Sequence, residues 1–181
     1  MKALIAVDTQ KLMWKQTGFG ARDFELRVGD DLVAKLTWPR LLSDLAVAEC
    51  ATGTWHIDRP GFFRQRTVVT LPGSDLEIAS FEPGWLGDGD LVLADGRVFQ
   101  WYQTKALRYS WALVGPDGDL LFEVHEGTRW FKHEAHVVLH AAVDAMPELP
   151  LLILTTWYLG FSQLQDAAGA VAATCTVAAC C

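Results

Sequence analysis

The fold is decided by residues 147–165, PELPLLILTTWYLGFSQLQ, because this stretch differs in kind from everything before it. From Leu149 to the C-terminus, Asp166 is the only charged residue. Pro150 suits the first turn of a helix, and no further proline follows, so the pattern predicts a helix over residues 150–170. Its large apolar residues surround the helix axis and leave no solvated stripe. Such a helix must be enclosed by protein or by lipid.

The chain before this helix, residues 2–142, is typical of an all-β protein, because short runs of alternating apolar and polar residues end at Gly, Pro or Asp turns. In residues 31–38, the side chains of Leu32, Ala34 and Leu36 share one face and Lys35 and Thr37 share the other. Further runs lie before residue 30 and at 45–51, 54–58, 66–71, 75–82, 90–94, 97–102, 109–115, 119–125 and 134–141. We therefore expect about twelve short strands.

The connections between these runs predict antiparallel neighbours. Gly-containing turns at 52–53, 72–73, 95–96 and 116–118 separate successive runs by only a few residues. Parallel strands would need crossovers of about a dozen residues or more, usually helical, and no helical period lies between the runs. This excludes a Rossmann fold and an α/β barrel.

The helix and the strands together predict a mainly β protein, a closed antiparallel barrel with one central hydrophobic C-terminal helix. Closure hides strand edges, and a barrel of more than about eight strands leaves a lumen that one apolar helix can fill. Leu152, Trp157 and Phe161 would fill it. The alternative is a membrane anchor, since the uncharged run Leu149–Gln165 has 17 residues, at the lower limit for a bilayer span. We expect one domain over residues 1–173 and a flexible cysteine-containing tail over 174–181.

The composition excludes several classes of protein. With 51% apolar residues the chain is expected to be ordered, and a net charge of -7 argues against nucleic-acid partners. Cys50 stands alone, the other cysteines are Cys175, Cys180 and Cys181, and no CxxC pair occurs. The N-terminal apolar run is too short for a signal peptide, so we expect a reducing, cytoplasmic location, or one peripheral to the inner face of the membrane.

Several stretches resemble the tubby C-terminal-like superfamily, which includes the tubby, LURP-one-related and phospholipid scramblase groups. They are residues 24–27, 34–41, 45–49, 53–55 and 147–152, and they are similar to small bacterial members. The resemblance extends over nearly the whole chain. It implies a barrel around a C-terminal hydrophobic helix and a binding or membrane-associated role. The calcium-binding and palmitoylated segments of scramblases have no counterpart here, and the resemblance assigns no site residue.

One basic loop is a candidate binding site. Arg59, Arg64 and Arg66 flank the sequence Pro-Gly-Phe-Phe, and this mixture of cations and aromatic rings suits contact with anionic lipid. The alternative is an ordinary solvated hairpin.

Four of the five histidines, His125, His133, His136 and His140, invite a metal interpretation. Their spacing opposes it, because in a strand His136 and His140 lie about 13 Å apart and His133 points to the other face. The acidic turn at residues 87–90 lacks the ligand spacing of an EF-hand. The eight tryptophans are spread along the chain, which favours packing over a stacking platform. We therefore predict no metal and no cofactor.

No nucleophile motif or phosphate-binding loop occurs in the sequence. The sequence thus predicts a non-catalytic binding or scaffold module rather than an enzyme. The expected partner of this module is an anionic lipid or a protein. The alternative is a membrane-associated, lipid-binding or scramblase-like protein in which residues 149–165 or the loop 59–66 contact the membrane.

Overall fold

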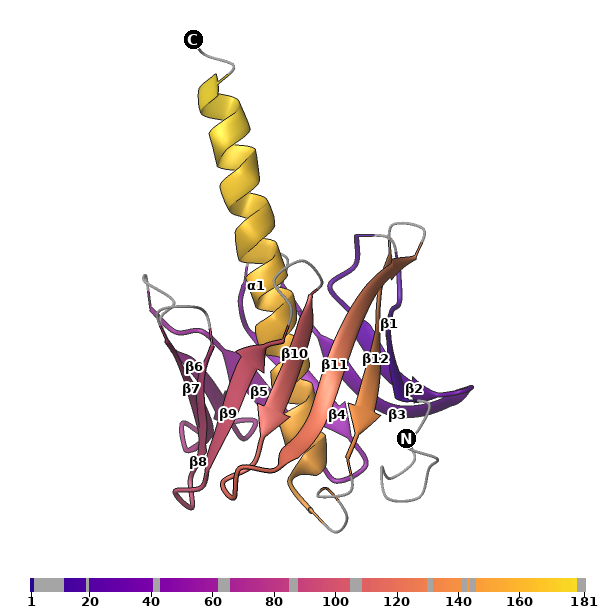
Figure 1. Cartoon of the computed structure of the whole chain (residues 1–181), viewed down its shortest axis with the longest axis vertical. Helices are drawn as coiled ribbons and strands as arrows, with labels where there is room; N and C mark the ends of the chain where they lie inside the picture. The colour runs from indigo at the N-terminus through magenta and orange to yellow at the C-terminus, as the bar shows by residue number, and fades with distance from the viewer. Residues whose placement is uncertain are drawn as a thin grey trace.

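The computed structural model describes residues 1, 12–18, 20–40, 43–61, 66–84, 88–104, 109–129, 132–140, 143 and 146–178. Side chains at 128–129 and 169–178 are not among the described features. Within these residues the chain forms twelve strands followed by one helix (Figure 1). The first predicted strand was to begin near residue 2, but residues 2–11 lie outside the described part.

The elements in chain order are β1 (Leu12–Gln16), β2 (Phe24–Val28), β3 (Asp31–Thr37), β4 (Ala46–Cys50), β5 (Gly53–Asp58), β6 (Thr67–Thr70), β7 (Glu77–Pro83), β8 (Gly89–Leu93), β9 (Val98–Gln103), β10 (Ser110–Val114), β11 (Leu120–Arg129), β12 (Lys132–Leu139) and α1 (Leu149–Ala178). Each strand pairs antiparallel with the next, and β1 pairs with β12. The predicted closed antiparallel barrel is therefore confirmed.

The alternation seen in the sequence sets which side chains enter the lumen. In β1, Leu12 and Trp14 are buried, and in β9 the same holds for Phe99 and Trp101. The last pairing closes the barrel by placing Leu12 opposite Val137. Because the side-chain period of a strand is two, this register brings the apolar faces of all strands to the inside.

The helix α1 passes through the lumen, as predicted (Figure 1). Leu152 and Trp157 are fully buried and Phe161 is 4% exposed. Trp157 stacks on Trp14 with ring centroids 5.6 Å apart. The first three turns of α1 are thus enclosed by the barrel, in agreement with the predicted central helix.

At Gly160, α1 lies in close contact with the barrel wall. A Cβ atom at this position would lie 2.9 Å from ring atoms of Trp111, nearer than such contacts normally allow. Glycine therefore lets the tryptophan of β10 pack directly against the helix backbone.

The C-terminal boundary of the helix differs from the prediction. The helix was expected to end at residue 170, but it continues to Ala178 and projects beyond the barrel (Figure 1). Residues 174–178 are helical and 179–181 lie outside the described part, so the expected flexibility of the tail over 174–181 stays a prediction. The sequence after Asp166 is rich in alanine, the strongest helix former, and contains no proline.

Candidate functional site

The barrel has two distinct ends, because the connections between successive antiparallel strands alternate between them. We term "base" the end where α1 begins and "rim" the end where it leaves. At the base, Glu148 forms an ion pair with Arg97, which also binds Asp95 at 2.8 Å. At the rim, Asp166 pairs with Arg59. Ionic contacts thus hold the helix where it enters and where it leaves the lumen.

Arg59 is the centre of the polar cluster at the rim. Its Nη1 donates to Asp166 Oδ2 at 2.6 Å, and its Nη2 lies 3.5 Å from Asp44 Oδ1. The side chain is only 10% exposed. Burial by itself lowers the pKa of Arg59, but the hydrogen bond and charge of Asp166 outweigh it and raise the pKa. Arg59 therefore fixes the helix to the barrel instead of pointing to solvent.

Arg66 lies at a different place, just before β6, and its partners come from β7. It donates to Glu77 at 2.9 and 2.6 Å and lies 3.8 Å from Glu82, and the hydrogen bond to Glu77 raises the pKa of Arg66. Arg64 lies outside the described residues. The structure thus pairs Arg59 and Arg66 with separate carboxylates and does not join them in one cationic patch. Their proposed role in lipid binding stays a prediction.

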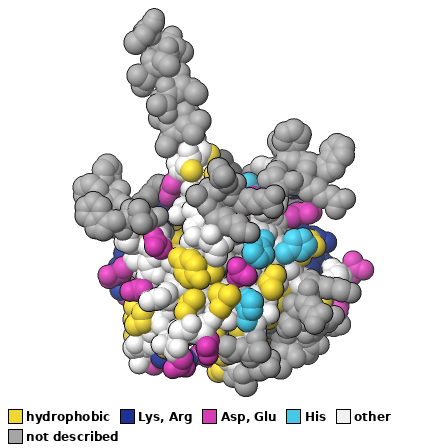
Figure 2. All heavy atoms as spheres, viewed as in Figure 1, with side chains coloured by type: hydrophobic (Ala, Val, Ile, Leu, Met, Phe, Trp, Pro, Cys, Tyr) yellow, Lys and Arg dark blue, Asp and Glu magenta, His cyan; other side chains and the backbone are white. Residues whose placement is uncertain are grey.

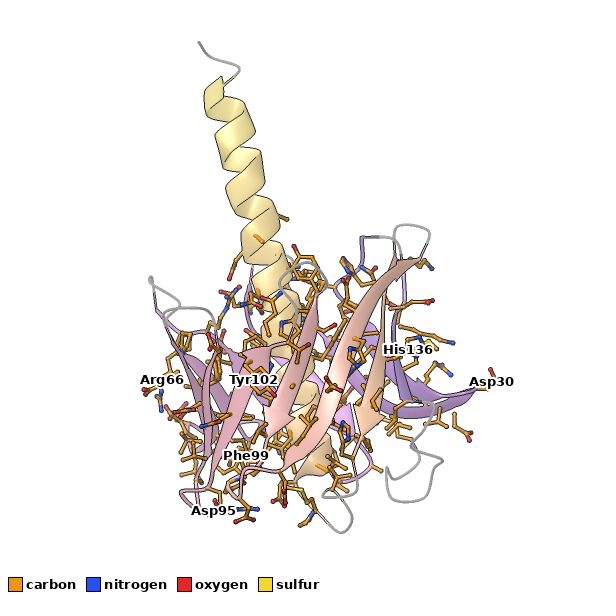
Figure 3. The ribbon with its side chains drawn as sticks, in the orientation of Figure 1. Asp30, Arg66, Asp95, Phe99, Tyr102 and His136 are labelled. Carbon is orange, nitrogen blue, oxygen red and sulfur yellow. The ribbon has the colours of Figure 1, made fainter. Side chains whose placement is uncertain are left out.

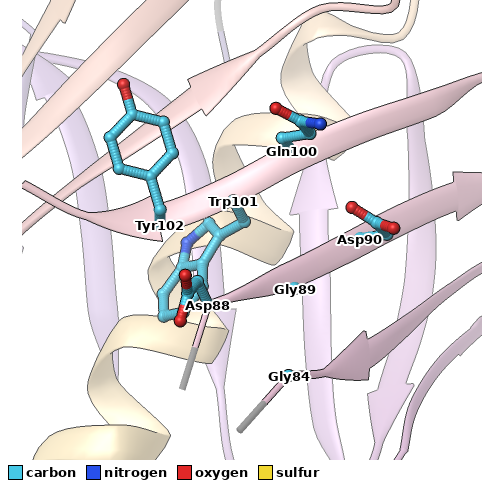
Figure 4. A pocket seen from close by; sticks show the side chains of 7 residues that line it. All are labelled: Gly84, Asp88, Gly89, Asp90, Gln100, Trp101 and Tyr102. Atoms are coloured by element: carbon cyan, nitrogen blue, oxygen red, sulfur yellow. The ribbon is translucent and has the colours of Figure 1, made fainter. Parts of the chain in front are cut away.

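A hollow of about 470 Å³ lies along β8 and β9, close to the rim (Figure 4). Its lining side chains are Asp88, Asp90, Gln100, Trp101 and Tyr102, with Gly84 and Gly89 between them. Gly89 is required there, since a Cβ atom would lie 2.2 Å from the carbonyl oxygen of Glu82. The hollow offers carboxylate and amide groups beside an aromatic ring, groups that suit binding.

The histidines lie mainly on the outer face of β11 and β12, where Figure 2 shows them beside acidic and hydrophobic side chains. His125 and His136 face each other across the two strands. Glu123 Oε2 lies 3.8 Å from His125 Nε2 and 3.7 Å from His140 Nε2. Across the described part of the chain, no group of three or more His, Cys, Asp or Glu side chains is arranged to hold a metal ion.

His133 points to the other side of its strand, as the sequence predicts. Its ring contacts Phe161 of α1 with centroids 5.6 Å apart, and its Nδ1 lies 2.6 Å from Glu126 Oε1. The sequence did not predict that His125 and His136 are cross-strand neighbours, because this pairing depends on the register between β11 and β12.

Tryptophans fill the lumen, as their spread along the sequence suggests. Trp14, Trp38, Trp101, Trp111 and Trp157 are buried, and Trp101 stacks on Trp111. Trp85 and Trp130 lie outside the described residues. These five tryptophans therefore serve the core of the barrel.

Comparisons with known proteins add no relative: no protein-family model, curated protein or solved structure matches this chain. The closed barrel with its C-terminal helix is consistent with the tubby-like arrangement at the level of fold. Among the described residues, no helix combines the length and the hydropathy needed to cross a bilayer.

Proposed function

We propose that the protein is a non-catalytic binding or scaffold module that engages its partner at the rim. One observation carries this proposal: α1 leaves the barrel and continues as a helix to Ala178. Asp166, Ala167 and Ala168 are already exposed. A helix that extends away from its own barrel presents a surface to another molecule.

The interior of the barrel is filled by the helix. Leu152, Trp157 and Phe161 occupy the lumen, so a partner meets the protein on its outer surface. There the hollow beside Tyr102 provides groups that recognise a ligand by hydrogen bonds and ring contacts. In the described part of the chain before α1, the thiol belongs to Cys50. Its Sγ lies 3.0 Å from Thr52 Oγ1.

Ser110, Glu123 and His125 follow one another along the chain in the order of a hydrolase catalytic triad. The geometry of these three side chains nevertheless favours a structural role. Ser110 Oγ lies 3.2 Å from His125 Nδ1, and Glu123 Oε2 lies 3.8 Å from His125 Nε2. Ser110 is only 4% exposed, and the distance between Glu123 and His125 is longer than a hydrogen bond. The backbone amides of β10 and β11 also bond to neighbouring strands, so they do not form an oxyanion hole.

The reactivity of the cysteine thiols, measured in extract of the cells that naturally make the protein, tests this function. In the Cys50→Ser variant, the remaining cysteines all lie beyond Asp166. Their thiols should react with a maleimide at least tenfold more slowly in fresh cell extract than after purification under reducing conditions. The matched control is Asp95→Cys at the base, in a chain with all four natural cysteines changed to serine. It should react equally in both samples. Equal reactivity of the tail thiols in both samples would contradict the proposal.

A further inference from the structure

The hollow along β8 and β9 gathers several polar side chains on the outer wall of the barrel. On β9, Gln100 and Tyr102 project outward, while Phe99 is buried. Figure 3 shows Tyr102 nearer than Phe99 to the end of the barrel from which α1 leaves. The register places Asp90 of β8 opposite Gln100, and Asp88 lies just before β8 (Figure 4). The hollow therefore presents two carboxylates, an amide and a phenol ring on one face.

These side chains are available to a ligand. Within the described part of the chain, no hydrogen bond or ion pair joins the side chains of Asp88, Asp90 and Gln100 to another residue. The ring of Tyr102 is 36% exposed. The described lining of the hollow contains no Lys or Arg, so no cation from that lining neutralises the two carboxylates.

The buried side of the hollow provides a second observation. Trp101 is 2% exposed, and its ring is held between Phe81 and Trp111, with centroids 5.5 and 6.5 Å away. Its Nε1 is buried and has no hydrogen-bond partner among the described residues. Other buried indoles share this feature, but of these Trp101 is the one that lines the hollow, and Figure 4 shows its nitrogen turned toward the side where Tyr102 and Asp88 lie. Since an unpaired buried N–H is costly, the hollow lacks an acceptor that a ligand can supply.

We infer that this hollow binds a neutral carbohydrate. The inference rests on the proposed function in treating the protein as a binding module, and it adds a site for a small molecule on the barrel wall. Sugar hydroxyls both donate and accept, so they donate to the carboxylates of Asp88 and Asp90 and accept from the N–H of Trp101. The C–H face of a sugar ring packs on the ring of Tyr102. The volume of about 470 Å³ lies within the range of about 300–1,000 Å³ for small-molecule sites.

The same groups select against ligands of other classes. An organic cation would satisfy the carboxylates, but an ammonium group only donates and would leave the N–H of Trp101 unpaired. A phosphate ester or another anion is repelled by Asp88 and Asp90. A neutral molecule rich in hydroxyl groups is therefore the best match to the lining.

NMR titration of the isotope-labelled full chain with maltotriose, cellotriose, mannotriose and chitotriose tests the inference. The indole N–H signal of Trp101, identified by resonance assignment, should shift with at least one of these trisaccharides, because its hydrogen bond forms on binding. Tyr102→Ala should weaken that binding at least tenfold, whereas Tyr102→Phe keeps the ring and should bind nearly as well. Tyr109→Ala is the matched control, since Tyr109 is 41% exposed and is not among the lining residues. It should bind as the unchanged chain does.

Carboxylate variants and salt distinguish a neutral sugar from a cation, for which spermidine is the probe. Asp90→Ala removes an acceptor and should weaken trisaccharide binding at least tenfold, whereas Asp117→Ala, exposed at the base, should leave it unchanged. The Debye length falls from about 8 Å at physiological salt to about 3 Å near 1 M. Binding of the neutral trisaccharide should therefore be the same at both salt levels, while binding of spermidine would weaken. Circular dichroism of each variant establishes that the barrel is intact.

Three results would overturn the inference: no shift of the Trp101 signal with any trisaccharide, equal effects of Tyr102→Ala and Tyr109→Ala, or binding of spermidine in place of the sugars. The thiol experiment separates this inference from the proposed function. Trisaccharide binding with unprotected tail thiols would keep the carbohydrate site and contradict a partner at the projecting helix. Protected thiols without trisaccharide binding would contradict the carbohydrate site and keep the proposed function.

Discussion

At the scale of single residues, Tyr158 shows how polar groups are accommodated in the filled lumen. Its hydroxyl is buried and donates to the backbone oxygen of Asp44 at 2.8 Å. Its ring stacks on Trp38 with centroids 5.6 Å apart. Since a buried hydroxyl without a partner is costly, this bond fixes how α1 is rotated against the connection between β3 and β4.

The same residue predicts a loss of stability at alkaline pH. Burial raises the pKa of Tyr158 above its ordinary value of about 10, so the native state favours the neutral phenol. Its contribution to stability is complete below about pH 10 and is lost as pH rises further, by up to about 1.4 kcal/mol per pH unit. Tyr158→Phe should cost about 0.5–1.5 kcal/mol at neutral pH, through the lost hydrogen bond, and flatten the alkaline decline.

Urea unfolding of the wild type and of Tyr158→Phe at a series of pH values measures this difference. Tyr102→Phe is the matched control, because Tyr102 is 36% exposed on the outer face of β9. It should retain the alkaline slope of the wild type. An unchanged slope in Tyr158→Phe would show that other groups cause the decline.

At the scale of elements, α1 is the part of the fold on which the barrel depends most. Leu152 is fully buried, and Leu152→Asp would place an unpaired charge in the lumen at a cost of several kcal/mol. Total stability of a domain is about 5–15 kcal/mol, so we expect the variant to be insoluble. Leu152→Met, of similar volume, should cost less than about 1.5 kcal/mol. Soluble yield and thermal melting compare the two, and a folded Leu152→Asp would contradict the role of the helix.

The strands and the helix could be predicted because their signals are local. Alternating side chains gave β8 as residues 90–94, against Gly89–Leu93 in the structure. The helix was identified from its uninterrupted apolar surface. Its end was not, because the large apolar residues stop near Leu164 while an alanine-rich stretch of mostly small residues continues the helix to Ala178. An expectation based on core packing therefore ended the helix too early.

The candidate site was harder to predict because it depends on contacts between elements. The sequence placed Arg59 and Arg66 in one basic loop, but their carboxylate partners come from other elements, Asp166 from α1 and Glu77 from β7. Which acid neutralises which base depends on strand register and on the rotation of the helix. The alternation of connections between two ends, by contrast, follows from counting antiparallel strands.

At the scale of the whole molecule, the core is a single unit shared by the barrel and α1. Trp157 of the helix contacts Trp14 of β1, Phe24 of β2 and Trp111 of β10. Leu149, near the base, and Phe161, near the rim, belong to the same buried cluster. Because every strand contacts this shared interior or a neighbour that does, we find no part of the described core that is independent of the helix.

A shared core predicts cooperative unfolding, with barrel and helix lost in one transition. Far-UV circular dichroism follows the strands and the helix, while tryptophan fluorescence follows the packing of Trp157 against Trp14 and Trp111. The two signals should give the same urea midpoint, because removing α1 would leave a lumen too wide for the strands' own side chains to fill. A chain ending at Met146 should accordingly fail to fold cooperatively. A fluorescence midpoint at clearly lower urea than the dichroism midpoint would mean that the helix leaves first and that the barrel persists without it.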